Sequence, residues 1–221
     1  MKYTIALWIA ITSQLATAQS ENPSQSKNFL FKMSPQHLTM NMLKVGGERL
    51  NKSRTKSFQL YVQVVSNNKR EDYAGSSFGH DGLGSEFMYK KYLLPFKELT
   101  NRKGRQFTQG IYFGGFIQGG YYKGNFRDNG FSWNPMTQTQ ISYTYDYLEK
   151  VSNGALGFTI GIQRLFWKVL TLDAYLGAGY QLSNQNITGT APAWVTDFYD
   201  FNEVNYVGIL PKFGLTIGVV L

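Results

Sequence analysis

The chain has 221 residues, no cysteine and a formal net charge of +8. The lack of cysteine excludes disulfides, thiolate metal sites and the acylated cysteine of a lipoprotein. Beyond the N-terminal segment, no stretch is as long and apolar as a membrane-spanning helix, which needs about 20 apolar residues. A helical membrane protein is therefore excluded, whereas membrane-crossing strands of about 9–11 residues with alternating polarity remain compatible with the sequence.

Residues 1–18 have the features of a secretory signal peptide. Lys2 supplies a positive start, residues 5–15 are mostly apolar, and Ala16-Thr17-Ala18 has the small-x-small form of a cleavage site. We therefore expect removal after Ala18. A retained anchor is the alternative, although the apolar run is too short to span a bilayer. Residues 19–28 are polar and are expected to form a flexible lead-in.

Residues 29–221 predict one all-β domain. Apolar and polar residues alternate with period two in stretches separated by polar turns, as in strands whose two faces meet different environments. Eight strands are expected at Phe29–Met33, Leu38–Leu50, Ser57–Ser66, Leu83–Leu94, Phe107–Phe126, Ala155–Leu165, Val169–Leu182 and Asn205–Leu221. The alternation weakens at Met40 and Met42, where a bulge would explain it.

The last strand shows a long apolar face. Its apolar set consists of Val207, Ile209, Pro211, Phe213, Leu215, Ile217, Val219 and Leu221, and most residues between them are small or polar. Such a face behind a secretory leader predicts an eight-stranded antiparallel transmembrane β-barrel, an up-and-down meander with its outside in lipid. Pro211 lacks a backbone N–H and is expected on a bulge or near the outer rim.

The lengths of the connections predict an orientation. Barrels of this kind have short periplasmic turns and longer extracellular loops. The short connections 51–56, 95–106 and 166–168 are therefore expected to be periplasmic. The longer connections 67–82, 127–154 and 183–204 are expected to be extracellular, with residues 140–147 as an outer extension of the next strand.

Basic residues gather in two connections, near residues 44–56 and 97–105. Outer-membrane lipids with anionic headgroups, or the phosphates of lipopolysaccharide, are plausible partners for such clusters. Solvated turns are the alternative reading. Nucleic acid is not expected as a partner because the signal peptide directs the chain to export.

The sequence resembles the small eight-stranded outer-membrane barrels of Bacteroidota, which are similar in plan to the barrel half of outer-membrane protein A. The resemblance lies in the Ala16-Thr17-Ala18/Gln19 junction, the strand Lys44-Val45-Gly46-Gly47-Glu48 and the segment Phe213-Gly214-Leu215-Thr216-Ile217-Gly218. It implies localisation in the outer membrane and recognition by the outer-membrane insertion machinery through the last strand. The chain departs from many such barrels by ending in Leu221 where they have Phe.

Six charged residues fall on the inward faces of the expected strands: Lys44, Glu48, Glu86, Lys90, Asp173 and Lys212. An eight-stranded barrel is filled by its own side chains. We therefore expect these charges to pair and to plug the lumen. A gated pore or a proton-linked carboxylate pair is the functional alternative.

The sequence contains no recognisable catalytic or metal-binding constellation. His37 and His80 are the only histidines, and a metal site needs several converging ligands, so neither a metal nor another cofactor is expected. Enzyme activity is not expected either. A lipid-modifying enzyme similar to lipid A deacylases is one alternative, and a soluble periplasmic carrier similar to lipocalins is another. The carrier would have its apolar faces inside, the reverse of a membrane barrel.

Aromatic residues are dense in the expected extracellular loops. The candidates for a binding surface are Trp133, Tyr143, Tyr145, Tyr147, Trp194 and Tyr199. Aromatic side chains are enriched in protein interfaces, and an upper aromatic girdle is the alternative. The sequence therefore predicts a structural or partner-docking role, with the chain as an accessory subunit of an outer-membrane complex.

Overall fold

The computed structural model describes residues 28–66, 70–71, 77–78, 80–100, 106–134, 136, 139–167, 169–190 and 206–221. The predicted signal peptide at 1–18 lies outside these residues, as do nearly all of the lead-in at 19–28 and the aromatic residues Trp194 and Tyr199.

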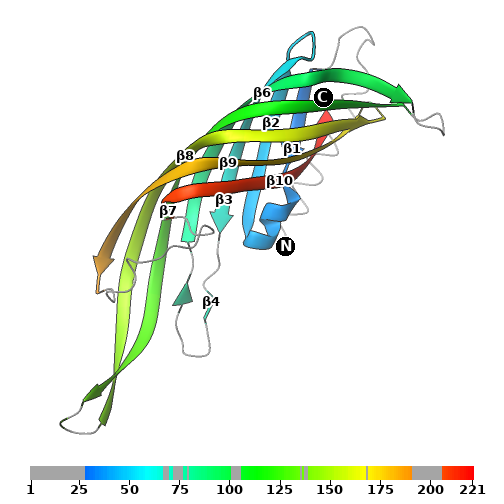
Figure 1. Ribbon diagram of the computed structural model, residues 1–221. Coiled ribbons are helices and arrows are strands. Elements are labelled where there is room, and N and C mark those ends of the chain that lie inside the picture. Colours follow the sequence, from blue (N-terminus) through cyan, green and yellow to red (C-terminus); the bar gives the residue numbers. More distant parts are fainter. Residues whose placement is uncertain are drawn as a thin grey trace.

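Eight antiparallel strands pair in a closed ring, and Figure 1 shows how they are arranged in space. The order around the ring is β1-β2-β3-β6-β7-β8-β9-β10, and β10 pairs again with β1. The strands are β1 (Phe29–Met33), β2 (Met42–Leu50), β3 (Lys56–Ser66), β6 (His80–Thr100), β7 (Gln106–Asn134), β8 (Thr139–Phe166), β9 (Leu170–Gly189) and β10 (Gly208–Val220). The predicted all-β antiparallel meander is confirmed.

The register around the ring fixes its geometry. Starting at Phe31 and following the paired residues through every strand leads to Ile209 on β10. Phe31 itself pairs with Val219, so the stagger is 219 minus 209, or ten residues. With a rise of about 3.3 Å per residue and a strand spacing of about 4.8 Å, this stagger tilts the strands by about 40° from the ring axis.

The two faces of the sheet differ in chemistry. Most side chains on the outer face are apolar and exposed; Phe158 and Leu176, for example, are 60% and 64% exposed. The inner face carries the buried polar and charged residues, and β3 alternates between exposed and buried positions along most of its length. Successive residues of a strand point to opposite faces, so the period-two pattern of the sequence becomes this separation.

Several strands are longer than the sequence pattern predicts. The expected connection at 95–106 is shorter, because β6 continues to Thr100 and β7 begins at Gln106. The expected loop at 127–154 is instead a long hairpin, in which β7 runs to Asn134 and β8 begins at Thr139. The strand extension predicted at 140–147 is therefore confirmed. The expected loop at 183–204 begins only after Gly189, where β9 ends.

The expected loop at 67–82 also contains paired backbone. Its described residues include β4 (Arg70–Glu71) and β5 (Ser77–Phe78), which pair with each other, and the start of β6 at His80. Backbone pairing does not require alternating polarity, so these extensions carry no periodic signal where both faces are polar.

The strand predicted from Leu38 to Leu50 begins later. Residues Pro35–Met40 form the 3₁₀ helix η2, and Asn41 follows it in the left-handed region with φ 54°. Pro35 fits the first turn of a helix, where its missing N–H has no partner to lose. The weakened alternation near Met40 and Met42 therefore reflects a helix and a turn, and β2 pairs with β3 without a register shift. No helix in the described part of the chain is long and apolar enough to cross a membrane.

The hairpin of β7 and β8 extends beyond the ring at the end away from the C-terminus (Figure 1). Among the described residues, neighbouring strands pair with it as far as Arg127 on β7 and Tyr147 on β8. Beyond that point the two strands pair with each other for about seven residues each, which is about 23 Å of strand, and no other described strand pairs with them. At the base of this part, Phe126 stacks on Tyr147 with ring centres 5.2 Å apart.

Candidate functional site

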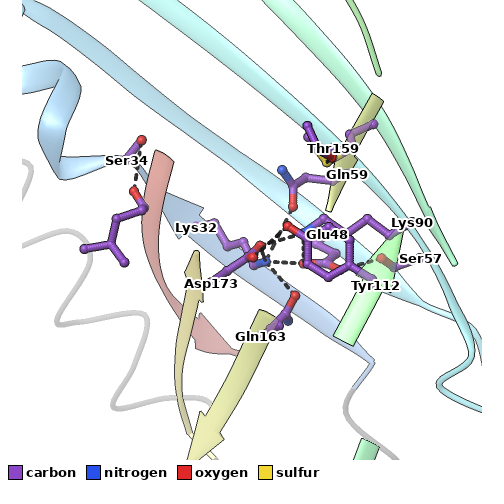
Figure 2. A network of polar contacts seen from close by, with 12 residues as sticks. Lys32, Ser34, Glu48, Ser57, Gln59, Lys90, Tyr112, Thr159, Gln163 and Asp173 are labelled. Carbon is purple, nitrogen blue, oxygen red and sulfur yellow. Dashed lines mark hydrogen bonds and ion pairs between the residues drawn. The ribbon is translucent and has the colours of Figure 1, made fainter. Parts of the chain in front are cut away.

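Two groups of charged side chains lie inside the ring. The first, called here the lower layer, consists of Lys32, Glu48, Lys90 and Asp173, from four different strands (Figure 2). Asp173 Oδ2 lies 2.8 Å from Lys32 Nζ and 2.6 Å from Lys90 Nζ. Glu48 pairs with Lys32 directly, and its Oε2 is 3.5 Å from Lys90 Nζ. Two cations and two anions therefore form a neutral, fully buried cluster.

Neutral polar side chains complete the lower layer. The Tyr112 hydroxyl donates to Asp173 Oδ1 over 2.8 Å, and the Ser57 hydroxyl donates to Glu48. Lys32 also donates to Gln163 Oε1 over 3.0 Å, and the Tyr92 hydroxyl lies 2.9 Å from Glu48 Oε1. Buried ions are tolerated when they are paired and when hydrogen bonds satisfy their remaining valences. This layer meets the first condition in full and most of the second: Glu48 Oε2 is held by its ion pairs with Lys32 and Lys90, whereas the buried Gln163 Nε2 has no hydrogen-bond partner among the described residues.

The second group, called here the upper layer, consists of Lys44, Glu86 and Lys212. Glu86 Oε2 accepts from Lys44 over 2.6 Å and from Lys212 over 2.8 Å. Lys212 donates in addition to Gln118 Oε1 over 2.6 Å, and its Nζ lies 3.8 Å from the centre of the Phe116 ring. Among the described residues, one carboxylate therefore serves two lysines, and this layer carries one surplus positive charge.

The structure places all six predicted inward charges inside the ring. Glu48, Lys90 and Asp173 meet in the lower layer, and Lys44, Glu86 and Lys212 meet in the upper layer. Large side chains fill the space around them, since Tyr61, Met88 and Tyr112 are among the most deeply buried residues. The arrangement holds strands together and occupies the interior.

Sequence reasoning missed Lys32. Its strand is only five residues long, Phe-Leu-Phe-Lys-Met, and so offers little periodic pattern. The signal was nevertheless present, because Leu30 and Lys32 alternate with Phe29, Phe31 and Met33, and a lysine opposite three apolar residues points inward. Without Lys32 the lower layer would carry a surplus negative charge.

Pro211 lies in a continuous stretch of pairing, which corrects the prediction of a bulge; it is the fourth residue of β10, counted from the end of the strand at Gly208. It pairs with Ala178 in an unbroken register between β9 and β10. Val220, at an even position, donates its N–H to Val169 on the β9 side, whereas Leu221, at an odd position, donates to Phe29 on the β1 side. The nitrogen of Pro211 therefore faces the β1 side. The last residue of β1 pairs with Ile217, so no described strand needs a donor there.

A short segment occupies the place where β1 ends. Ser34 Oγ donates to Leu215 O over 3.1 Å, and Gln36 Oε1 accepts from Leu215 N over 3.3 Å. Ser34 N donates to Lys44 O over 3.0 Å. Side chains at the start of η2 thus replace part of the missing strand pairing between β10 and β2.

His37 contacts a serine that the sequence analysis did not pair with it. Its Nδ1 is 2.8 Å from Ser34 Oγ. Ser34 is almost fully buried, and its hydroxyl is directed at Leu215 O, so this contact fixes η2 and does not present a nucleophile. The side chain of His80 lies outside the described part. Among the described residues, no three potential metal ligands of the His, Cys, Asp and Glu types come together.

The aromatic candidates for binding separate into exposed and buried residues. Tyr143 and Tyr145 both lie on the projecting hairpin. Tyr143 is 39% exposed, and its ring centre lies 6.4 Å from that of Tyr145. Tyr147 is buried against Phe126 and stabilises the base of the hairpin. Trp133 is on β7, but its side chain lies outside the described part.

Comparison with models of known protein families, with curated proteins and with solved structures found no match for this chain.

Proposed function

We propose that the ring is an outer-membrane β-barrel with a plugged lumen and a structural or partner-docking role. The observation that carries this proposal is the arrangement of the two faces, with charged side chains buried inside and a continuous apolar band exposed outside. Exposing such a band to water would be costly, because removing apolar surface from water is favourable by about 25 cal/mol per Å². A carrier with an apolar interior would need the opposite arrangement.

The height of the apolar band supports a membrane location. On β9 the outward residues run from Leu172 to Leu182, which is ten steps along the strand. At about 3.3 Å per residue and a tilt of about 40°, they cover about 25 Å along the ring axis, which is the height of the apolar band in outer-membrane barrels.

Exposed basic residues flank the apolar band at both ends, with Lys123 and Lys150 toward the hairpin of β7 and β8. Outward-facing, exposed cations occur near the short connections, namely Arg49 on β2, Lys56 on β3, Lys91 on β6 and Arg164 on β8. Such side chains favour anionic lipid headgroups at a membrane boundary. The lengths of the connections favour an orientation in which the short ones are periplasmic and the hairpin of β7 and β8 is extracellular.

The docking role rests on this hairpin. It extends beyond the paired ring and carries Tyr143 and Tyr145. Tyrosine is enriched in protein interfaces because it combines a large apolar ring with a hydrogen-bonding hydroxyl. A protein partner that contacts the hairpin would make the chain an accessory subunit of an outer-membrane complex.

The membrane part is tested by fractionation. Carbonate washing should leave the protein in the membrane pellet, and the purified protein should migrate differently on gels before and after heating. Release by carbonate would contradict the proposal. In planar bilayers, we expect no stable channel, and reproducible single-channel steps would contradict the plugged lumen.

The docking part needs a separate experiment. Partners would be captured from native membranes with the intact chain and with a chain in which residues 128–145 are replaced by a short turn. The control is Arg127→Ala, which leaves the hairpin in place. Loss of the same partner only from the shortened chain is expected, whereas equal recovery would contradict docking at the hairpin.

A further inference from the structure

The strand pairing of the wall is interrupted between β10 and β2. The last pair between β1 and β10 is Met33 with Ile217, whereas β10 begins nine residues earlier, at Gly208. At the odd positions of β10, backbone groups face the β1 side, as Leu215 and Leu221 show. Phe213, like Pro211, therefore faces a side on which no described strand pairs with it.

The interruption is unsuited to adding another strand. Pro211 lies in its middle and offers no N–H, and proline at this position blocks the ladder that a docking strand would need. With one strand missing between them, β10 and β2 are about 10 Å apart at this level, twice the usual strand spacing. Such a separation suits an acyl chain, which forms no backbone hydrogen bonds.

The strands on either side of the interruption supply the two lysines of the upper layer. Lys44 lies on β2 and Lys212 on β10, and both point inward to Glu86. Outside the two layers, Asp146 pairs with Arg127, Glu149 accepts from Gln185, and Asp81 on β6 is exposed. A surplus buried charge is costly unless a counter-ion accompanies it. Among the described residues, the upper layer is therefore short of one anion beside the interruption.

The outer side of the interruption is apolar. Phe213 on β10 is 75% exposed, and Leu43 on β2 and Leu38 on η2 are exposed as well. The described hydrogen bonds of η2 to β10 run through the side chains of Ser34 and Gln36. Displacing η2 from β10 would therefore break no strand pairing.

We infer that an anionic amphiphile of the surrounding membrane binds at this interruption, with its acyl chain along Phe213 and Leu43 and its headgroup between Lys44 and Lys212. This inference rests on the proposed membrane location. The headgroup supplies the charge that the upper layer lacks, the acyl chain covers the exposed apolar edge, and η2 moves aside to admit the headgroup. A neutral amphiphile would cover the exposed apolar edge but would leave the surplus positive charge of the upper layer without a counter-ion.

The first test measures binding of dodecyl phosphate to the full chain in a non-ionic detergent, by native mass spectrometry and by the shift of the thermal unfolding midpoint. Dodecyl phosphate should form a complex of one molecule per chain and should raise the midpoint. Dodecyl maltoside and inorganic phosphate, which each supply one half of the ligand chemistry, should not. An equal effect of inorganic phosphate, or no effect of dodecyl phosphate, would overturn the inference.

Variants of the charged residues test whether the upper layer binds the phosphate group. Lys212→Met should weaken dodecyl phosphate binding about tenfold or more, because it removes one charge-assisted hydrogen bond. Lys44→Met should do the same and serves if the first variant does not fold. Glu86→Gln should strengthen binding, since it frees both lysines, whereas a purely structural role predicts no gain. Lys91→Met, at an exposed outward lysine, is the matched control and should leave binding unchanged.

Failure of the inference can be separated from failure of the proposed function. Insertion into liposomes, followed by carbonate extraction, tests the membrane location without any ligand. A chain that inserts but does not bind dodecyl phosphate would overturn the inference alone. If Lys91→Met weakened binding as much as Lys212→Met, the attraction would be general surface charge and the inference would be overturned as well.

Discussion

The wall formed by β7, β8 and β9 and the wall where β10 meets β1 and β2 differ in how completely their backbones are paired. β7 and β8 pair with each other along nearly their whole length, and β9 is paired on both sides from Leu170 to Gln181. On the other side β1 contributes only five residues, and η2 takes its place above Met33. We call the first the closed wall and the second the interrupted wall.

The buried charges differ in parallel with the walls. The lower layer lies at the level where all eight strands pair, and it is neutral. The upper layer draws both of its lysines from the strands beside the interruption and carries a surplus charge. A sealed interior needs balanced charge, whereas a surplus charge beside an interruption can be neutralised by a counter-ion from outside the ring.

The largest expected effect is in the lower layer. Asp173→Asn leaves Lys32 and Lys90 with Glu48 as their only carboxylate, and we expect a loss of about 3–5 kcal/mol in the free energy of unfolding. Urea unfolding in detergent micelles, followed by circular dichroism, measures it. Asp146→Asn is the control, since its pair with Arg127 is exposed, and it should cost no more than about 1 kcal/mol.

A proline in the closed wall should have the next largest effect. Ala178 lies opposite Pro211 and is paired on both sides, so Ala178→Pro removes a ladder hydrogen bond and should cost about 2–4 kcal/mol. The shift of the denaturation midpoint is the measurement. If this variant were as stable as the parent, the distinction between the two walls would be wrong.

Neutralising the acid of the upper layer should cost less than neutralising that of the lower layer. Glu86→Gln leaves Lys212 bonded to Gln118, and we expect a loss of about 1–3 kcal/mol. The double variant Glu86→Gln/Lys212→Met should recover part of that loss, because it also removes a cation left without its partner. If the free energy of unfolding fell as much as in Asp173→Asn, the interruption would not lower the cost of removing a buried carboxylate.

The smallest effect is expected at the edge of the interrupted wall. Pro211→Ala restores an N–H that faces no described strand, so the change acts mainly on the unfolded chain and should cost at most about 1 kcal/mol. Thermal unfolding of this variant beside Ala178→Pro compares the two walls at paired positions. A large gain in stability would instead show that the new N–H finds a partner.

The sequence predicted the features that depend on alternating polarity. The positions of the eight strands and their meander order follow from side chains that must face either an apolar or a polar environment, and so do the inward charges at Lys44, Glu48, Glu86, Lys90, Asp173 and Lys212. These features are strong because a shift by one residue would move every side chain to the wrong face.

The sequence did not predict features that depend on backbone pairing or on short segments. Strand extensions such as β7 beyond Phe126 are held by backbone bonds, which leave no polarity pattern when both faces are polar. η2 is a single short helix, and Pro35 is the one sequence signal for its start. The grouping of the charges into two layers depends on the stagger of the ring, which no single strand reveals.

The seam between β1 and β10 sets where the cylinder can part. If only the eight ring strands are counted, seven of the eight pairings join strands that follow one another along the chain, and the pairing of β1 with β10 joins the first to the last. That seam consists of four aligned residue pairs, Leu30–Met33 with Ile217–Val220. When it separates, the remaining meander stays intact as a curved sheet with two free edges. The cylinder therefore opens most readily at this seam, because it is held by the fewest residue pairs of any pairing in the ring.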